Sequence, residues 1–282
     1  MLQAVRNAFR LPDLRAKILF TLGILLVYRF AAHVPVPGVD QNALRNFMQD
    51  NTLGQIYNLL SGGALENFSI MAMGVYPYIT ASIIMQLLTP IVPYLEELQK
   101  EGEQGRNKIN QYTYRITVPL AFLTGLGQIA IMRQAQVLPG FGVNLESMAT
   151  LMALTAGTMF AVWLGDLITE QGIGNGISII IFGGIVAGAP TVITQLSRDV
   201  PQLIIFLLVM VVTVVFIVFV QEGQRRVPVQ YGRQIRGRAT RGGQSTHVPL
   251  RVNASGMIPI IFSQSVIIFP GIVGGYLATV QN

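Results

Sequence analysis

The chain has 282 residues, of which 51% are hydrophobic and 11% are charged. Soluble domains carry about 25% charged residues, so this composition excludes an ordinary soluble protein and indicates an integral membrane protein. The chain contains no cysteine and two histidines, which excludes disulfides and thiolate metal sites and argues against a histidine metal cluster, and we expect neither a metal nor a cofactor.

The amino-terminal region predicts a cytoplasmic tail and a first membrane span. Residues 1–17 contain four basic side chains and no small-residue cleavage site, which argues against a cleaved signal peptide. Residues 18–32 are apolar but short for a span, so Lys17 and Arg29 must extend toward the two interfaces. Residues 34–60 then predict an external loop with a turn and a short helix.

The stretch 61–93 predicts an interrupted membrane segment. No Asp, Glu, Lys, Arg or His lies between Glu66 and Glu96, and this run exceeds the about 20 residues that a spanning helix needs. Gly74 and Pro77 interrupt it, because glycine loosens the backbone and proline cannot donate a helical hydrogen bond. We expect a short segment, a break and a spanning helix, set in a cavity because lipid does not tolerate irregular backbone.

The rest of the chain predicts five further spans separated by polar segments. Residues 96–114 are dense in charge and predict a loop on the side of the amino terminus. The basic segment 221–252 predicts another long loop on that side. Four of these spans are predicted at residues 116–132, 147–165, 202–220 and 254–278, and the remaining one follows a glycine-rich turn within residues 168–182 and runs to about Leu196.

The distribution of positive charge predicts the orientation of the chain. Fifteen of the 19 lysines and arginines lie in the segments on the side of the amino terminus. Cytoplasmic loops of membrane proteins are enriched in these residues, so we expect a cytoplasmic amino terminus. Seven spans then place Asn282 on the outer side.

The glycine-rich sequence GIGNGI at residues 172–177 predicts a tight turn in which Asn175 caps the next helix. A dinucleotide site would need GxGxxG within a βαβ unit, and the chain has no Walker A lysine. Asp166 and Glu170 flank the end of a span, where they are easily solvated, which favours a structural role over a proton relay. No HExxH or GxSxG motif occurs, and we expect that the protein is not an enzyme.

The basic segment 221–252 contains seven arginines and one acidic side chain, Glu222. Such an excess enforces membrane topology or binds anionic lipid headgroups in many proteins. The β-prone sequence VPVQY and the spaced arginines equally suit a projecting hairpin that binds phosphates or an acidic partner. Composition alone leaves both interpretations open.

Five longer motifs resemble the SecY family, the channel subunits of the bacterial protein translocase. They are SGGALENFSI at 61–70, GVYPYITASIIMQLL at 74–88, KEGEQGRNKINQYT at 100–113, WLGDLITEQGIGNGISIIIF at 163–182, and QRRVPVQY at 224–231 with QSTHVPLRVN at 244–253. The resemblance implies an all-α polytopic membrane helix bundle, with about seven transmembrane helices here of a ten-helix pseudo-symmetric channel fold. Residues 1–196 would form the amino-terminal half with spans 1–5. Residues 197–282 would begin the carboxy-terminal half, with spans 6–7 and the basic cytoplasmic loop.

The resemblance also implies roles for particular residues. Residues 55–65 correspond to a plug that blocks the closed channel, and Gln86 and Gln264 correspond to polar contacts of a lateral gate. The aliphatic pore ring corresponds to Val75, Ile79, Ile177, Ile181 and Ile261. Partner docking corresponds to Arg225, Arg226, Arg233, Arg236, Arg238 and Arg241. Without the resemblance, packing is the default interpretation of the five aliphatic residues.

The function that the resemblance implies is a non-enzymatic protein-conducting channel in the bacterial cytoplasmic membrane. The implied partners are the small subunits SecE and SecG, the SecA motor ATPase, the ribosome, signal peptides, nascent chains and the lipid bilayer. Two other classes are alternatives, a solute or ion transporter with broken helices and a non-conducting membrane scaffold. The lack of charges in mid-span and the large basic loop argue against a transporter. Conductance measured with and without a trapped nascent chain separates the three classes.

Overall fold

The computed structural model describes residues 11–36, 39–40, 42–44, 46, 68–134, 136–138, 145–197, 199–229, 234–236, 239–241, 246–253 and 263. Within these residues the chain is mainly helical, and short strands occur in the basic segment. The helices are α2 (Pro12–Ala31), α5 (Tyr76–Leu88), α6 (Pro93–Lys100), α7 (Glu103–Gln134), α8 (Leu145–Gln171), α9 (Gly176–Leu196) and α10 (Val200–Glu222). The strands are β1 (Gln224–Val229), β2 (Gln234–Arg236), β3 (Ala239–Arg241) and β4 (Thr246–Arg251).

The described chain forms two compact units that meet in sequence at residues 191 and 192. The first unit contains α2, α5, α6, α7, α8 and most of α9, and the second contains the end of α9, α10 and the strands. The predicted pseudo-symmetric halves divide at residue 196. The two units are defined by compactness and not by symmetry, so they do not test this prediction. That division stays a prediction.

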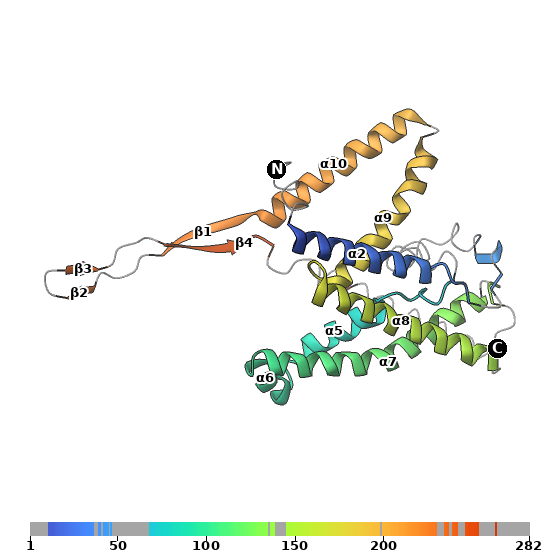
Figure 1. Ribbon diagram of the computed structural model, residues 1–282, viewed down its shortest axis with the longest axis horizontal. Coiled ribbons are helices and arrows are strands. Elements are labelled where there is room, and N and C mark those ends of the chain that lie inside the picture. The colour runs from blue at the N-terminus through green and yellow to red at the C-terminus, as the bar shows by residue number, and fades with distance from the viewer. Residues whose placement is uncertain are drawn as a thin grey trace. The chain divides into compact units, whose positions relative to one another are not determined.

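The first unit is a helix bundle in which α7 packs against α5, α6 and α8, while α8 also packs against α2 (Figure 1). Its described buried residues form one cluster around α7 and α8, a second around α2, α8 and α9, and a smaller third one where α5, α6 and α7 meet. Large apolar side chains also point outward, including Leu26, which is 70% exposed, and Leu123, which is 58% exposed. Helices that are apolar on both the packed and the outward face are typical of a membrane environment.

The interrupted segment is present, and its helix is shorter than a bilayer crossing requires. Gly74 has a φ of +52°, a conformation that glycine adopts without strain, and α5 begins two residues later with Pro77 in its first turn. Helix α5 has 13 residues and is followed by a bend of 97° into α6. The predicted break before the helix is therefore confirmed, and the two helices meet the length and hydropathy of a span only as a bent pair.

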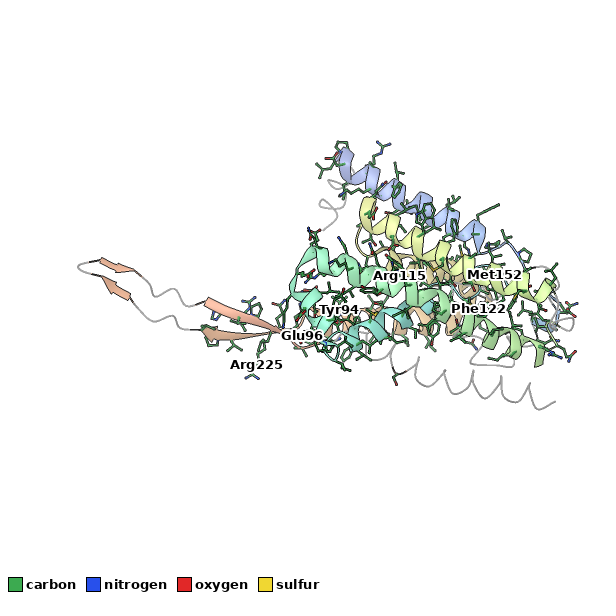
Figure 2. The ribbon with its side chains drawn as sticks, turned by 90° about the horizontal axis from the view of Figure 1, so that it is seen from below. Tyr94, Glu96, Arg115, Phe122, Met152 and Arg225 are labelled. Atoms are coloured by element: carbon green, nitrogen blue, oxygen red, sulfur yellow. The ribbon has the colours of Figure 1, made fainter. Side chains whose placement is uncertain are left out.

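The predicted loop at residues 96–114 is wrong, because the segment is almost entirely helical. Helix α6 and the first turns of α7 form a helical hairpin around Gly102, whose φ is +79°. The hairpin buries Leu95 and Leu98 against α7, while Glu96 lies on the exposed side of α6 (Figure 2). The high charge of the segment concealed this apolar stripe, which a helix needs along one face only.

Three described helices are long and apolar enough to cross a membrane, namely residues Glu103–Arg133, Ser147–Gln171 and Val200–Glu222. They contain the predicted spans at 116–132, 147–165 and 202–220, and each helix extends beyond the predicted ends. Helix α8 continues through Asp166 and Glu170, so these acids lie within its last turns instead of following it.

The other predicted spans have different outcomes. Helix α2 covers the predicted first span as far as Ala31, one residue short of its predicted end, and its charged side chains Asp13, Arg15, Lys17 and Arg29 leave it outside the helices that qualify by composition. Helix α9 begins at Gly176, directly after Asn175 of the predicted glycine turn, and its apolar part Gly176–Pro190 is shorter than a full span. The predicted seventh span at 254–278 lies outside the described residues, apart from Ser263.

The second unit consists of a long apolar helix followed by antiparallel strands. Helix α10 has 23 residues, of which none is buried, and its charges are confined to its carboxyl end. Strands β1 and β4 pair in antiparallel register from Gln224 opposite Arg251 to Val229 opposite Thr246, and β2 pairs with β3 (Figure 1). The predicted hairpin is therefore present, while its predicted binding of phosphates or of an acidic partner stays a prediction.

Candidate functional site

The chain enters α5 through an irregular segment, residues 68–75, in which every residue is buried except the partly buried Ile70. Phe68, which is 0% exposed, accepts a hydrogen bond from the Val36 amide at 3.1 Å, and the Ile70 amide donates to the Val34 carbonyl at 3.2 Å. These bonds form an isolated antiparallel bridge that ties the segment to the end of α2. Irregular backbone inside a membrane bundle needs such partners, because lipid offers none.

Helix α8 approaches this segment so closely that glycine is required. A Cβ added to Gly157 would lie only 1.9 Å from the Ile70 carbonyl oxygen. The backbone of α8 therefore packs directly on the backbone of the segment, and the start of α5 is held at a fixed position within the bundle.

Four of the five predicted ring residues come together in this region. Val75 precedes α5 and Ile79 lies one turn later, while Ile177 and Ile181 lie in the first turns of α9. All four belong to one apolar cluster, in which Val75 is 1% exposed and the three isoleucines are partly buried. Two segments about 100 residues apart in sequence thus contribute equivalent aliphatic pairs. The fifth predicted residue, Ile261, lies outside the described residues.

The predicted gate glutamine on α5 is exposed. The Gln86 Nε2 donates a hydrogen bond to the Ser82 Oγ one turn earlier, at 3.3 Å. This bond lies within one helix and leaves the amide on the surface of α5. The second predicted gate residue, Gln264, lies outside the described residues, as does the plug at 55–65.

A polar cluster connects three helices and was not predicted as a unit. The Tyr114 hydroxyl of α7 donates a hydrogen bond to the Asp166 Oδ2 of α8 at 2.9 Å. The Tyr78 ring of α5 stacks on the Tyr114 ring, with 5.7 Å between the centroids. Half-buried tyrosine hydroxyls usually find a partner, so tyrosines in otherwise apolar spans were the available signal. The favoured structural role for Asp166 agrees with this contact.

The predicted docking arginines that are described lie in the ribbon of β1 and β4 and in the shorter pair of β2 and β3. Arg225 and Arg226 are both exposed near the start of β1, and Figure 2 shows the Arg225 side chain there. Arg236 is paired with Ala239, and Arg241 is paired with Gln234. Arg233 and Arg238 lie outside the described residues.

The β1–β4 ribbon has two chemically different faces. Successive side chains of a strand alternate between faces, and directly paired residues share one. One face therefore holds Gln224, Arg226, Pro228, His247, Pro249 and Arg251, and it is basic. The opposite face holds Arg225, Val227, Val229, Val248 and Leu250, and it is mainly apolar. This separation was not predicted, and Arg251 on the basic face is not among the predicted docking residues.

Proline on each strand limits how the ribbon can bind. Pro228 lies opposite His247 and Pro249 lies opposite Arg226. Proline has no amide hydrogen, so within a sheet it occupies positions whose amide faces away from the partner strand. Each outer edge of the ribbon consequently lacks a donor, which disfavours addition of a third strand and leaves the two faces for partner contacts.

Comparison with known proteins gives one family. The family model described as SecY matches residues 69–281. The protein translocase subunit SecY of Streptomyces scabiei is 43% identical over 97% of this chain and 67% of the relative.

Two solved structures share the fold of this chain. One is a SecY channel studied for its plug domain, with a TM-score of 0.61 and 18% identity over 94% of this chain and 58% of that chain. The other is Sec61 in the canine ribosome–channel complex from the endoplasmic reticulum, with a TM-score of 0.62 and 16% identity over 94% of this chain and 59% of that chain. The chain thus spans about two thirds of the length of its curated relative and less than two thirds of the solved channels. These matches confirm the predicted family and the predicted helix-bundle fold of a multi-pass membrane protein.

Proposed function

The chain belongs to the SecY family of protein translocase subunits, and we propose that it forms part of a protein-conducting channel in the bacterial cytoplasmic membrane. The channel passes unfolded secretory polypeptides across the membrane and releases membrane spans sideways into it. It is not an enzyme, and a partner supplies the work of transport. The identity to a named translocase subunit over 97% of the chain carries this proposal.

An aliphatic ring is suited to sealing such a channel. A polypeptide in transit presents every type of side chain in turn, and fixed hydrogen-bonding groups would retain some of them. Branched aliphatic side chains close around whatever passes and exclude water from the neck at rest. The shared cluster of Val75, Ile79, Ile177 and Ile181 supports this role, and Ile261 completes the proposed ring.

The proposed plug and lateral gate control two different exits. Residues 55–65 close the channel from the outer side, and the solved relative whose plug domain stabilises the closed state supports this assignment. Helix α5, with Gln86, forms one wall of the gate, and the span with Gln264 forms the other. A nascent span of about 20 apolar residues gains free energy by leaving an aqueous pore for lipid.

The basic ribbon is proposed to dock cytoplasmic partners. Its arginines suit ribosomal RNA phosphates or acidic surfaces of SecA, because guanidinium groups bind such oxygens in bidentate fashion. The relative solved in a ribosome–channel complex supports the ribosome as one partner. SecE and SecG are proposed as the small membrane subunits, and signal peptides and nascent chains as the transported partners. The amino terminus is cytoplasmic in this arrangement, on the side of the ribbon.

The seal can be tested by conductance of the full-length protein. Replacing Ile79 and Ile181 together by serine wets the neck, so the resting channel should leak ions because entering ions no longer shed all their hydration. Val214→Ser on the exposed surface of α10 is the control and should leave the conductance unchanged. The measurement is single-channel recording in planar bilayers, with and without a trapped nascent chain.

The same recordings separate the alternatives. A channel conducts more in the ring variant and is blocked by the trapped chain. If the ring variant folds but conducts no more than the Val214→Ser control, the assignment of the aliphatic residues to a pore is wrong. A transporter or a scaffold would then be the better interpretation.

A further inference from the structure

The turn between α8 and α9 is held by its own backbone geometry and a side-chain cap. Gly174 has a φ of +67°, which favours glycine. The Asn175 Oδ1 accepts a hydrogen bond from the Ser178 amide at 3.1 Å, as an N-cap does. These features account for reversal of the chain but do not determine where α9 lies on α8.

A single hydroxyl ties the first residue of α9 to α8. The Thr169 Oγ1 donates a hydrogen bond to the Gly165 carbonyl at 3.0 Å, within α8. The same oxygen accepts a hydrogen bond from the Gly176 amide at 2.9 Å. The side chain of Thr169 therefore bridges the backbones of two helices across the turn.

The two helices are in backbone contact at the same place. A Cβ added to Gly176 would lie 1.8 Å from the Gly165 carbonyl oxygen and 2.8 Å from the Ile168 Cβ. Even alanine would therefore require the start of α9 to move away from α8 by a large fraction of an atomic diameter. Glycine at position 176 therefore permits an approach that no other residue allows, whereas a Cβ at Gly165 would make only a tight contact with Ile177.

A second close contact lies two turns further along α9. A Cβ added to Gly183 would lie 2.8 Å from the Leu25 Cδ2 of α2. Residues seven apart share a helix face, so Gly176 and Gly183 lie on one side of α9. Ile180, which is 1% exposed, lies close to that face as well. This glycine face packs α9 onto α8 and α2.

The predicted ring isoleucines lie between these two contacts. At about 100° per residue, Ile177 and Ile181 lie roughly 100° and 140° around the helix from Gly176. Ile177 also borders the contact itself, since a Cβ on Gly165 would lie 3.0 Å from the Ile177 Cγ1. Both side chains share the apolar cluster with Val75 and Ile79. The position of the glycine face consequently determines where the two isoleucines lie in that cluster.

We propose that Gly165, Thr169 and Gly176 form a clamp that positions Ile177 and Ile181 against Val75 and Ile79 and thereby sets the tightness of the resting seal. The clamp rests on the proposed channel function and adds positioning residues for the ring. Thr169 does not contact the transported chain in this role and acts through α9. A seal depends on close fit, so displacement of one helix leaves gaps through which water and ions pass.

The test compares glycine substitutions on one helix in the full-length protein. Gly176→Ala forces the start of α9 away from α8 and should raise the resting ion conductance several-fold in planar bilayers. Gly188→Ala is the matched control, because a methyl group there would meet no atom within 4 Å. The unfolding temperature in detergent shows which variants keep their fold, and Ile79→Ser with Ile181→Ser provides the leaking reference.

A milder pair of variants keeps the test valid if Gly176→Ala does not fold. Thr169→Val removes both hydrogen bonds at similar volume and should also leak, whereas Thr169→Ser keeps the hydroxyl and should seal normally. A purely structural role would lower the unfolding temperature of Thr169→Val without changing its resting conductance.

The outcomes separate the clamp from the channel function. Leaks in Gly176→Ala or Thr169→Val, with sealed Gly188→Ala and Thr169→Ser, support the clamp. If the ring reference leaks while folded Gly176→Ala and Thr169→Val seal normally, the clamp is overturned and the channel assignment stands. If the ring reference itself does not leak, the channel assignment fails and the clamp fails with it.

Discussion

The contact between Tyr114 and Asp166 joins residues that lie 52 positions apart in the chain. Asp166 is half-buried in the last turns of α8, and the Tyr114 hydroxyl supplies a donor from α7. The Tyr78 ring stacks on Tyr114 and brings α5 into the same contact. One hydrogen bond and one ring pair thus connect the helix carrying Ile79 to helix α8, which carries Gly165 and Thr169 of the proposed clamp.

We expect Tyr114→Phe to destabilise the bundle by about 1–2 kcal/mol, because Asp166 loses a hydrogen-bond donor in a partly buried position. A double-mutant cycle with Asp166→Ala, measured by equilibrium unfolding in detergent, isolates the pair. Asp166→Asn is the control, since its amide oxygen still accepts a bond from Tyr114. A coupling free energy indistinguishable from zero would mean that the contact has no energetic role.

At the scale of the element, the β1–β4 ribbon separates charge from apolar surface. Arg226 and Arg251 lie on one face, and Val227, Val248 and Leu250 lie on the other. The apolar face is open, with Leu250 53% exposed. The prolines disfavour addition of a further strand at either edge of the ribbon, so we expect a partner to contact one of the two faces. The basic face is suited to binding phosphate groups.

Neighbouring arginines on opposite faces provide a matched test of docking. Arg226→Glu places a negative charge on the basic face and should weaken binding to ribosomes several-fold, with a reduced dependence on salt. Arg225→Glu makes the same charge change on the apolar face and should weaken binding less. Binding is measured by co-sedimentation of the full-length protein in detergent with ribosomes over a range of salt concentrations.

Equal losses in the two variants would show that net charge, and not the face, decides docking. Normal binding by both variants at physiological salt would leave the arginines with a role in topology alone.

At the scale of the whole molecule, the described helices differ strongly in how they bury their apolar surface. More than half of the most apolar stretch of helix Ser147–Gln171 is buried, whereas none of the corresponding stretch of helix Val200–Glu222 is buried. Helix α8 is therefore a central helix of its unit, with neighbours in α2, α5 and α7. The distribution of lysines and arginines along the chain predicts how these helices are oriented in the membrane.

The cysteine-free chain allows this orientation to be tested by labelling. A cysteine in place of Gln99, which is exposed on α6, should react with a membrane-impermeant maleimide only from the cytoplasmic side. A cysteine in place of Ser197, which is exposed between α9 and α10, should react only from the outside. Reaction of both from the same side of intact vesicles and spheroplasts would contradict the predicted topology.

The sequence alone determined the class of the protein and most of its helices. Apolar runs predict spans such as 116–132 and 202–220, and Gly74 and Pro77 predict the break before α5. Both predictions succeed because hydrophobicity and backbone conformation are local properties of the chain. The family, the ring candidates and the arginine-rich hairpin were also accessible, since long motifs and β-prone residues are contiguous.

Only the tertiary structure decided which distant residues meet. It showed that residues 96–114 are almost entirely helical. Helix α6 is stabilised by the packing of Leu95 and Leu98 on α7, a contact that the local sequence does not reveal. It placed Tyr114 beside Asp166 and the backbone of Gly176 against that of Gly165. Such contacts depend on the angle and distance at which two helices cross, and these follow from the packing of many side chains together and not from any local pattern.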